Sequence, residues 1–200
     1  MVAISGAVVR GATALGALAL AACGGRAAPA GAAPASPGTG APVVLAIGRA
    51  FVLEAGGVPA GDTTVTFPAG AARVIVLRHG PPDRTVFAEL RFPAGTFRAA
   101  PAESVSVTVR PLPGLFGLEL VTSAEFAGEG ALVFRYARNF LAPMGSTARY
   151  PDNSALERAL SVAWLQPDAT LLLLPSRRPA ADNLQAPLRA GGRYLLVAPA

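Results

Sequence analysis

The sequence predicts an all-β protein, an antiparallel β-sandwich of the immunoglobulin-like or a related Greek key type, with at most one short helix. Apolar and polar residues alternate in short segments, most strictly over residues 104–110 (SVSVTVR), which is the pattern of a half-buried strand. No long segment has the helical period. Turns that contain Gly, Pro or Asp separate the short segments, as at residues 59–62, 80–83, 166–168 and 191–192.

The predicted strands cover residues 63–67, 72–78, 85–92, 104–110, 118–121, 132–137, 160–165, 170–174 and 193–198. The four consecutive leucines at 171–174 do not alternate with polar residues. We therefore expect them in a central strand that is covered on both faces.

One short helix is expected near residue 154. Ser154 and Glu157 have the spacing of a capping box, in which the two side chains satisfy free amides at a helix start. Alternation resumes soon afterwards, so the helix should give way to a strand near Leu160.

The N-terminal segment, residues 1–22, has the features of a secretion signal. Arg10 is the only charge before an uncharged, Ala- and Leu-rich stretch at residues 11–22. These 12 residues are too few to span a bilayer, which takes about 20, but they suit the apolar region of a signal peptide. An ordinary signal peptide with a small-residue cut is one interpretation.

Residues 20–23 (LAAC) resemble the lipobox of bacterial lipoprotein precursors, and Cys23 is the only cysteine of the chain. The resemblance implies cleavage between Ala22 and Cys23 and transfer of diacylglycerol to the Cys23 thiol. Two or more acyl chains would hold the protein stably on a membrane. Gly24 follows the cysteine where Asp would direct retention in the inner membrane of enteric bacteria, so the outer membrane is favoured.

Residues 23–42 form the lipidated cysteine and a tether rich in Ala, Pro and Gly. Residues 24–42 include no aromatic and no β-branched aliphatic residue. The tether therefore lacks the side chains that a hydrophobic core requires. The folded domain is expected at residues 43–200. With Cys23 consumed by lipid, no disulfide is available to it.

The net charge of +5 raises the question of nucleic-acid binding. All 17 basic residues are Arg, and they are scattered along the chain. Arg177 and Arg178 are the only adjacent pair, and no basic cluster alternates with aromatic residues. The sequence therefore predicts no nucleic-acid partner.

The chain offers few residues for catalysis or metal binding. One histidine and one lipidated cysteine make a zinc or copper site improbable, and no cofactor is predicted. His79 precedes a Gly-Pro-Pro turn and is expected to be a surface turn residue. The polar residues that calcium would need are expected in turns and caps; these are Asp152, Asn153, Asp168, Asp182 and Asn183.

Aromatic residues suggest a contact surface. Trp164 and Tyr136 lie in alternating segments and are expected in the core, although together with Tyr150 and Tyr194 they are also candidates for a carbohydrate platform. The irregular segment 140–150 (FLAPMGSTARY) is the better candidate for an exposed contact surface. Its residues Phe140, Met144 and Tyr150 are the predicted contacts.

The tetrapeptide FPAG occurs at residues 67–70 and again at residues 92–95. The order of a strand, FPAG, a strand ending in VTVRPLPG and the segment SAEFAGEGALVFRYA resembles the β-sandwich domain of ankyrins and netrin receptors. The FPAGA turn at 67–71 and the closing segment GRYLLVAP carry the resemblance, whereas Gly130 and Ala131 stand where that family usually has proline. The resemblance implies protein contacts and no active site.

Taken together, the sequence predicts a lipid-anchored protein of the cell envelope that acts as a non-catalytic binding or structural module, with a possible envelope protein as partner. The alternative is a small envelope hydrolase or carbohydrate-active protein. Such an enzyme would use His79 as a base or a pair of carboxylates.

Overall fold

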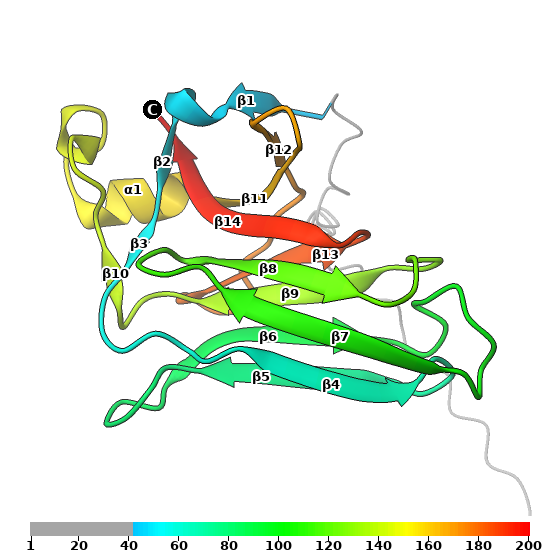
Figure 1. Ribbon diagram of the computed structural model, residues 1–200. Coiled ribbons are helices and arrows are strands. Elements are labelled where there is room, and N and C mark those ends of the chain that lie inside the picture. Colours follow the sequence, from blue (N-terminus) through cyan, green and yellow to red (C-terminus); the bar gives the residue numbers. More distant parts are fainter. Residues whose placement is uncertain (1–41) are drawn as a thin grey trace, which may run out of the picture. The chain divides into compact units, whose positions relative to one another are not determined.

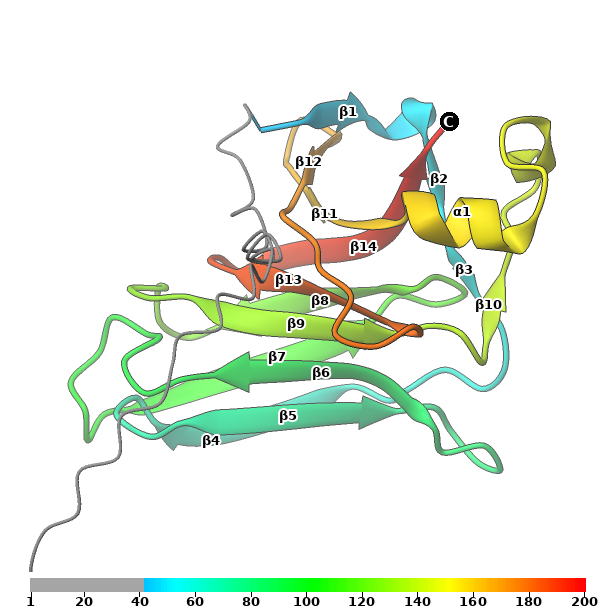
Figure 2. The same cartoon turned by 180° about the vertical axis from the view of Figure 1, so that it is seen from behind.

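The computed structural model describes residues 42–200, which fold as an antiparallel β-sandwich, as predicted. The larger sheet has the strand order β1-β12-β11-β14-β8-β7-β4, with β2 also paired to β14, and the smaller sheet has the order β13-β9-β6-β5 (Figures 1 and 2). A third pair consists of β3 and β10. The predicted signal peptide, Cys23 and most of the tether lie outside the described residues.

The strands of the larger sheet are β1 (Val44–Ala46), β2 (Ala50–Val52), β4 (Thr63–Pro68), β7 (Ser104–Pro111), β8 (Gly117–Thr122), β11 (Ser161–Leu165), β12 (Thr170–Leu173) and β14 (Gly192–Pro199). The smaller sheet consists of β5 (Arg73–Arg78), β6 (Val86–Phe92), β9 (Gly130–Arg135) and β13 (Asn183–Leu188). The short pair is β3 (Glu54–Ala55) and β10 (Phe140–Leu141), and the helical elements are η1 (Ile47–Arg49), η2 (Ser146–Ala148) and α1 (Asn153–Ala159).

Every predicted strand falls on an observed one, because each combines alternation with a turn at its end. The sequence prediction missed five strands, namely β1, β2, β3, β10 and β13. Four of these have only two or three residues, too few to show a period. The fifth, β13, contains Pro187, which removes a backbone donor and weakens the strand signal.

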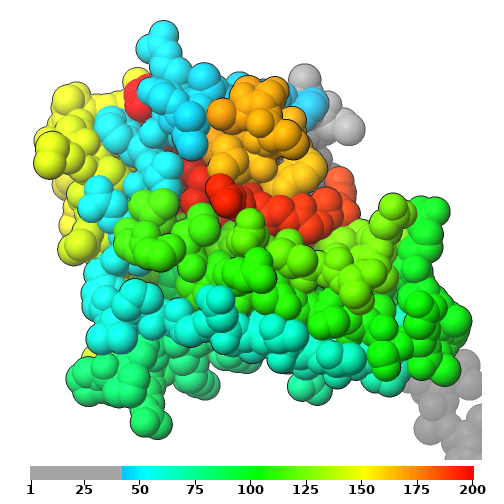
Figure 3. All heavy atoms as spheres, viewed as in Figure 1, coloured from blue at the N-terminus to red at the C-terminus, as the bar shows by residue number. Residues whose placement is uncertain are grey.

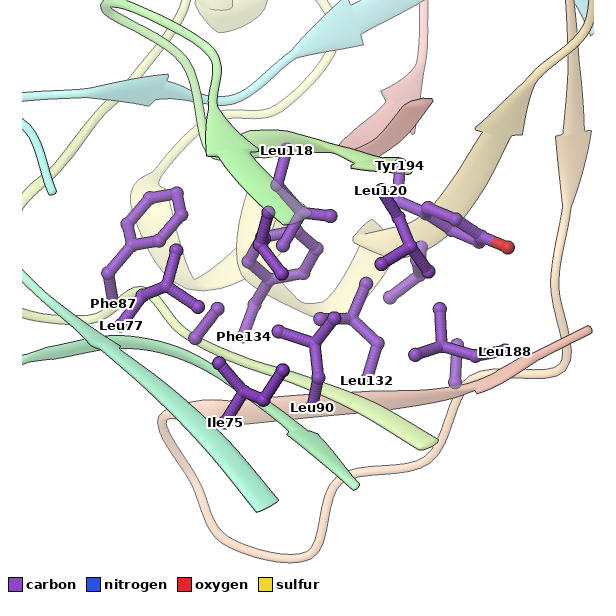
Figure 4. Close-up of a cluster of buried hydrophobic side chains, with 14 of the residues drawn as sticks. Ile75, Leu77, Phe87, Leu90, Leu118, Leu120, Leu132, Phe134, Leu188 and Tyr194 are labelled. Carbon is purple, nitrogen blue, oxygen red and sulfur yellow. The ribbon is translucent and has the colours of Figure 1, made fainter. Parts of the chain in front are cut away.

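The main core lies between the two sheets, where inward-facing side chains from both meet (Figure 4). In β7 the alternation works as expected: Val105, Val107 and Val109 are fully buried, while the polar residues between them face outward. Ile75 and Leu90 come from the smaller sheet, and face residues such as Leu118 and Leu120 from the larger one.

A second, smaller core lies on the outer face of the larger sheet. Its buried members are Ala163, Leu171, Leu195 and Val197, and the segment that runs through β1, η1 and β2 packs against them. Figure 3 shows this blue segment beside the orange and red atoms of β12 and β14. As a result β14 has five consecutive buried residues, from Tyr194 to Ala198.

The expectation for the leucine run is only half right. β12 does lie inside the sheet, between β1 and β11. It is not covered on both faces, however, because Leu171 is fully buried whereas Leu172, Leu173 and Leu174 stay partly exposed. The smaller sheet has four strands and the larger sheet extends past it at this end (Figure 2).

The single α-helix of residues 42–200 begins two residues earlier than the capping box predicted. Asp152 is the N-cap, and its carboxylate accepts a hydrogen bond of 2.7 Å from the backbone amide of Ala155. Ser154 therefore lies inside α1 rather than at its start. The extended backbone of Asp152 lets a short side chain reach this amide, as N-cap residues generally do. The helix gives way to β11 at Ser161, as expected.

The two FPAG segments form equivalent turns at the ends of β4 and β6. In each turn the proline carbonyl accepts a hydrogen bond from the amide three residues later, at 2.9 Å after Pro68 and 3.2 Å after Pro93. The amide of Gly95 also donates to the carbonyl of Ala69, and the rings of Phe67 and Phe92 have their centroids 6.2 Å apart. The repeated tetrapeptide thus places two phenylalanines in one aromatic cluster.

Gly130 provides a test of how closely β6 and β9 approach each other. A methyl group at this position would lie 2.8 Å from the backbone carbonyl oxygen of Arg91, which cannot move without shifting β6. We expect Gly130→Ala to lower the free energy of unfolding by about 1–3 kcal/mol. Gly61→Ala is the control, because nothing lies within 4 Å of the added methyl, and denaturant unfolding measures both. Equal stability of the two variants would contradict the close packing.

Candidate functional site

The predicted contact segment, residues 140–150, lies at one end of the sandwich (Figure 1). Its start is fixed to the body by the pairing of β10 with β3, in which Phe140 lies opposite Ala55 and Leu141 opposite Glu54. The backbone amide of Gly56 also donates to the carbonyl of Asn139. These backbone contacts hold the base of the loop.

Met144 projects from the tip of this loop and is 95% exposed. Gly145 follows it with a φ of 81°, in the left-handed region that favours glycine. The next residue, Ser146, is buried, and its amide donates to the carbonyl of Pro143. The buried Ser146 and its backbone hydrogen bond thus fix the turn, while the Met144 side chain faces solvent. Leu141, which the sequence analysis did not single out, is 54% exposed in the same loop.

Phe140 and Tyr150 are half-buried and anchor the loop. The Tyr150 hydroxyl donates a hydrogen bond of 2.7 Å to the carbonyl of Pro199, and its ring makes an edge contact with Phe51. The ring of Phe140 packs edge-on against Tyr136. Of the three residues predicted as contacts, Met144 is almost fully exposed, whereas Phe140 and Tyr150 are only partly exposed.

A polar cluster joins the neighbouring loop, residues 79–85, to the turn before β10. The side-chain amide of Asn139 donates to the Asp83 carboxylate at 2.8 Å, and the Thr85 hydroxyl donates to it at 2.6 Å. These hydrogen bonds, together with the charge of Arg138, hold the pKa of Asp83 below its ordinary value. The cluster joins the two loops, and within residues 42–200 the side-chain partners of Asp83 are Thr85, Asn139 and Arg138.

The expectation that His79 is a surface residue is wrong. Its side chain is 4% exposed and makes edge contacts with the rings of Phe87 and Phe116. Its Nδ1 lies 3.2 Å from the carbonyl oxygen of Val58, which can only accept, so Nδ1 carries a proton. Within residues 42–200, Nε2 has no hydrogen-bond partner. The predicted strand ended at residue 78, as β5 does, so the alternation gave no indication that the residue after it is buried.

Six of the 12 acidic side chains, which a glycosidase would need as its carboxylates, form ion pairs with arginines. Glu89 pairs with Arg91 and Arg135, and Glu119 pairs with Arg110 and Arg193. Two further ion pairs are Arg98–Glu125 and Arg189–Glu129. Apart from Glu89 and Arg91, which lie in the same strand, these pairs join residues that are distant in the sequence, and the sequence alone does not predict them.

The described residues contain no group of three or more His, Cys, Asp or Glu side chains that could hold a metal ion. Asp152 and Asp168, two of the candidate ligands for a calcium site, are a cap residue and a turn residue, as expected. Asp152 caps α1, and Asp168 accepts hydrogen bonds from the amide and hydroxyl of Thr170, which lower the pKa of Asp168. No helix within residues 42–200 has the length and apolar character required to cross a membrane.

The aromatic residues do not form an exposed platform. Tyr136 and Tyr194 are buried in the core, which confirms the expectation for Tyr136. Trp164 is only partly buried and its indole nitrogen has no partner within residues 42–200. Burial raises the pKa of the Tyr194 hydroxyl to about 12, and this hydroxyl donates a hydrogen bond of 2.7 Å to the carbonyl of Ala190.

No family model, no curated protein and no solved structure matches this chain. The resemblances to lipoprotein precursors and to the sandwich domain of ankyrins and netrin receptors therefore stay predictions from the sequence. Within residues 42–200 the structure shows a sandwich with a projecting apolar loop tip and with six carboxylates paired to arginines.

The raised pKa of Tyr194 predicts a loss of stability at high pH. The folded state binds the phenolic proton more tightly than the unfolded state, so this contribution is complete below pH 10 and is lost as the pH rises from about 10 to about 12. We expect the free energy of unfolding to fall by up to about 3 kcal/mol over this range. In Tyr194→Phe this part of the pH dependence should vanish; urea unfolding at several pH values measures it. An unchanged pH slope in Tyr194→Phe would contradict the assignment.

Proposed function

We propose that this chain is a lipid-anchored protein of the bacterial cell envelope that acts as a non-catalytic binding or structural module. The observation that carries the proposal is the LAAC segment at residues 20–23, which places the only cysteine of the chain directly after an apolar stretch and two small residues. A cysteine at this position has a chemical role as the acceptor of diacylglycerol. The small residues before it suit the signal peptidase.

The segment after Cys23 supports the same proposal. A tether of 19 residues between Gly24 and Pro42 would reach about 25 Å as a random coil. This distance lets a sandwich domain stand clear of the lipid headgroups. Gly24, in place of Asp, favours the outer membrane as the site of attachment.

The loop tip at Leu141 and Met144 is the surface that we assign to an envelope protein partner. Both side chains are apolar and exposed, and Met adapts to partner surfaces of different shape. The loop is fixed at its base by β3 and β10 and at its end by Tyr150. A rigidly held tip loses little conformational entropy on binding.

The placement of His79 and of the carboxylates favours a binding module over a hydrolase. A serine hydrolase needs an imidazole hydrogen-bonded to a hydroxyl and to a carboxylate. In residues 42–200 the Nδ1 of His79 instead donates to the backbone carbonyl of Val58. Its Nε2 has no hydrogen-bond partner there, and the imidazole packs against the rings of Phe87 and Phe116. Most acidic side chains of the sheets are neutralised by arginines.

The anchor is tested by the substitution Cys23→Ala. Because no other thiol is present, we expect this variant to lose all labelling by radioactive palmitate and to leave the membrane fraction. Gly24→Asp is the matched variant: it should retain the label but move the protein to the inner membrane in an enteric host. Labelling of Cys23→Ala at the wild-type level would refute the lipoprotein assignment.

The contact surface is tested by photocrosslinking in intact envelopes. A photoreactive residue at position 144 should give a discrete crosslinked product with an envelope protein, and Leu141→Ser should reduce its yield several-fold. Position 121 is the control, since Val121 is 45% exposed on the outer face of the larger sheet. Identical products from both positions would count against a partner surface at the loop tip.

A further inference from the structure

The two sheets differ in width, and the difference leaves part of the larger sheet uncovered. Directly opposed residues form a row across its inner face, from Leu118 through Tyr194, Trp164 and Leu172 to Val44. Burial decreases along this row: Leu118 and Tyr194 are buried, Trp164 and Leu172 are partly buried, and Val44 is 50% exposed. The smaller sheet ends at β13, which lies against β11, so β12 and β1 extend beyond it (Figure 2).

A cavity of about 120 Å³ lies under this overhang. Its floor is Trp164 and Leu172, and Leu174, Pro175 and Pro187 form its walls. This volume is somewhat smaller than the about 150 Å³ of an apolar cavity that accepts a benzene ring, so the cavity has room for a short alkyl chain. The lining is apolar apart from Arg189 at its edge and the Tyr194 hydroxyl, which is already hydrogen-bonded to Ala190.

A groove of about 760 Å³ adjoins the cavity, and both share Pro175, Pro187 and Arg189 in their linings. The groove carries an excess of positive charge. Arg189 pairs with Glu129 at 2.7 Å, whereas Arg177 has no ion pair within residues 42–200. One uncompensated guanidinium therefore stands in the groove, next to an apolar cavity. This arrangement is complementary to a ligand with an apolar body and an anionic end.

The edge of β13 excludes an added peptide strand as the occupant. The backbone amide and carbonyl of Gln185 already bond to those of Arg177, at 2.8 and 2.9 Å. Pro187, the next outward-facing position, has no amide hydrogen to donate. Recognition in this groove must therefore come from side chains and the cavity, not from a backbone ladder.

We propose that the cavity and groove form a binding site for a small alkyl carboxylate. The alkyl chain lies in the cavity against the Trp164 ring, and the carboxylate binds the guanidinium of Arg177, with Arg189 beside it. Guanidinium groups match the planar carboxylate with two parallel hydrogen bonds. The site uses only residues of the folded domain, so the inference does not rest on the lipid anchor.

Trp164 is the only tryptophan of the chain, so its fluorescence reports on this cavity directly. The experiment titrates the full-length Cys23→Ala protein, which carries no acyl chain of its own, with butanoate, hexanoate and octanoate. We expect a saturable change in Trp164 emission and affinity that rises about fourfold for each methylene until the cavity is full. Hexan-1-ol, which lacks the charge, should bind at least about tenfold more weakly.

Two substitutions separate the contributions of head and tail. Arg177→Gln should weaken hexanoate binding at least about tenfold, while the control Arg98→Gln, in an exposed ion pair outside this groove, should leave it unchanged. Leu174→Phe should fill the cavity and remove the dependence on chain length. The absence of a saturable change in wild-type emission, equal affinities for hexanoate and hexan-1-ol, or equal binding by the two arginine variants would each overturn the proposal.

Discussion

β14 is buried on both faces, and the arrangement of the other strands of the larger sheet follows from this burial. Tyr194, Leu196 and Ala198 point into the main core, while Leu195 and Val197 point into the second core. On one edge β14 pairs with β11, and on the other with β8 and then β2. Because a strand buried on two faces needs apolar cover above and below, the N-terminal segment through β1 and β2 has to return and cover the outer face.

The unequal widths of the sheets follow from this arrangement. The turn between β11 and β12 and the return of β1 add strands to the larger sheet at an end where the smaller sheet has none. Trp164 and the leucines of β12 are therefore left half covered, beside a cavity that the segments around Pro175 and Pro187 only partly close. An apolar cavity with an uncompensated arginine nearby is the physical basis for the proposed carboxylate site.

The opposite end of the sandwich differs in character. There His79 packs against two phenylalanine rings, and the hydrogen bonds of Asp83 join neighbouring loops. A loop that is fixed at its base exposes Met144 to solvent. Across the sheets, arginines take up most of the acidic side chains in ion pairs. These features favour recognition through surfaces and cavities, which agrees with the proposed role of a binding module held at a membrane.

The fold class and the positions of the longer strands follow from the sequence alone. Alternation and turn residues are local signals, and each of these strands has enough residues to show a period. The sequence also located Met144 in an irregular segment and supplied the whole case for lipidation at Cys23. The folded structure was needed to show that His79 is buried, that Asp152 rather than Ser154 caps α1 and that the leucines after Leu171 are partly exposed. Burial depends on which distant strand covers a face, and the choice of cap depends on which oxygen reaches the amide. No local pattern encodes either.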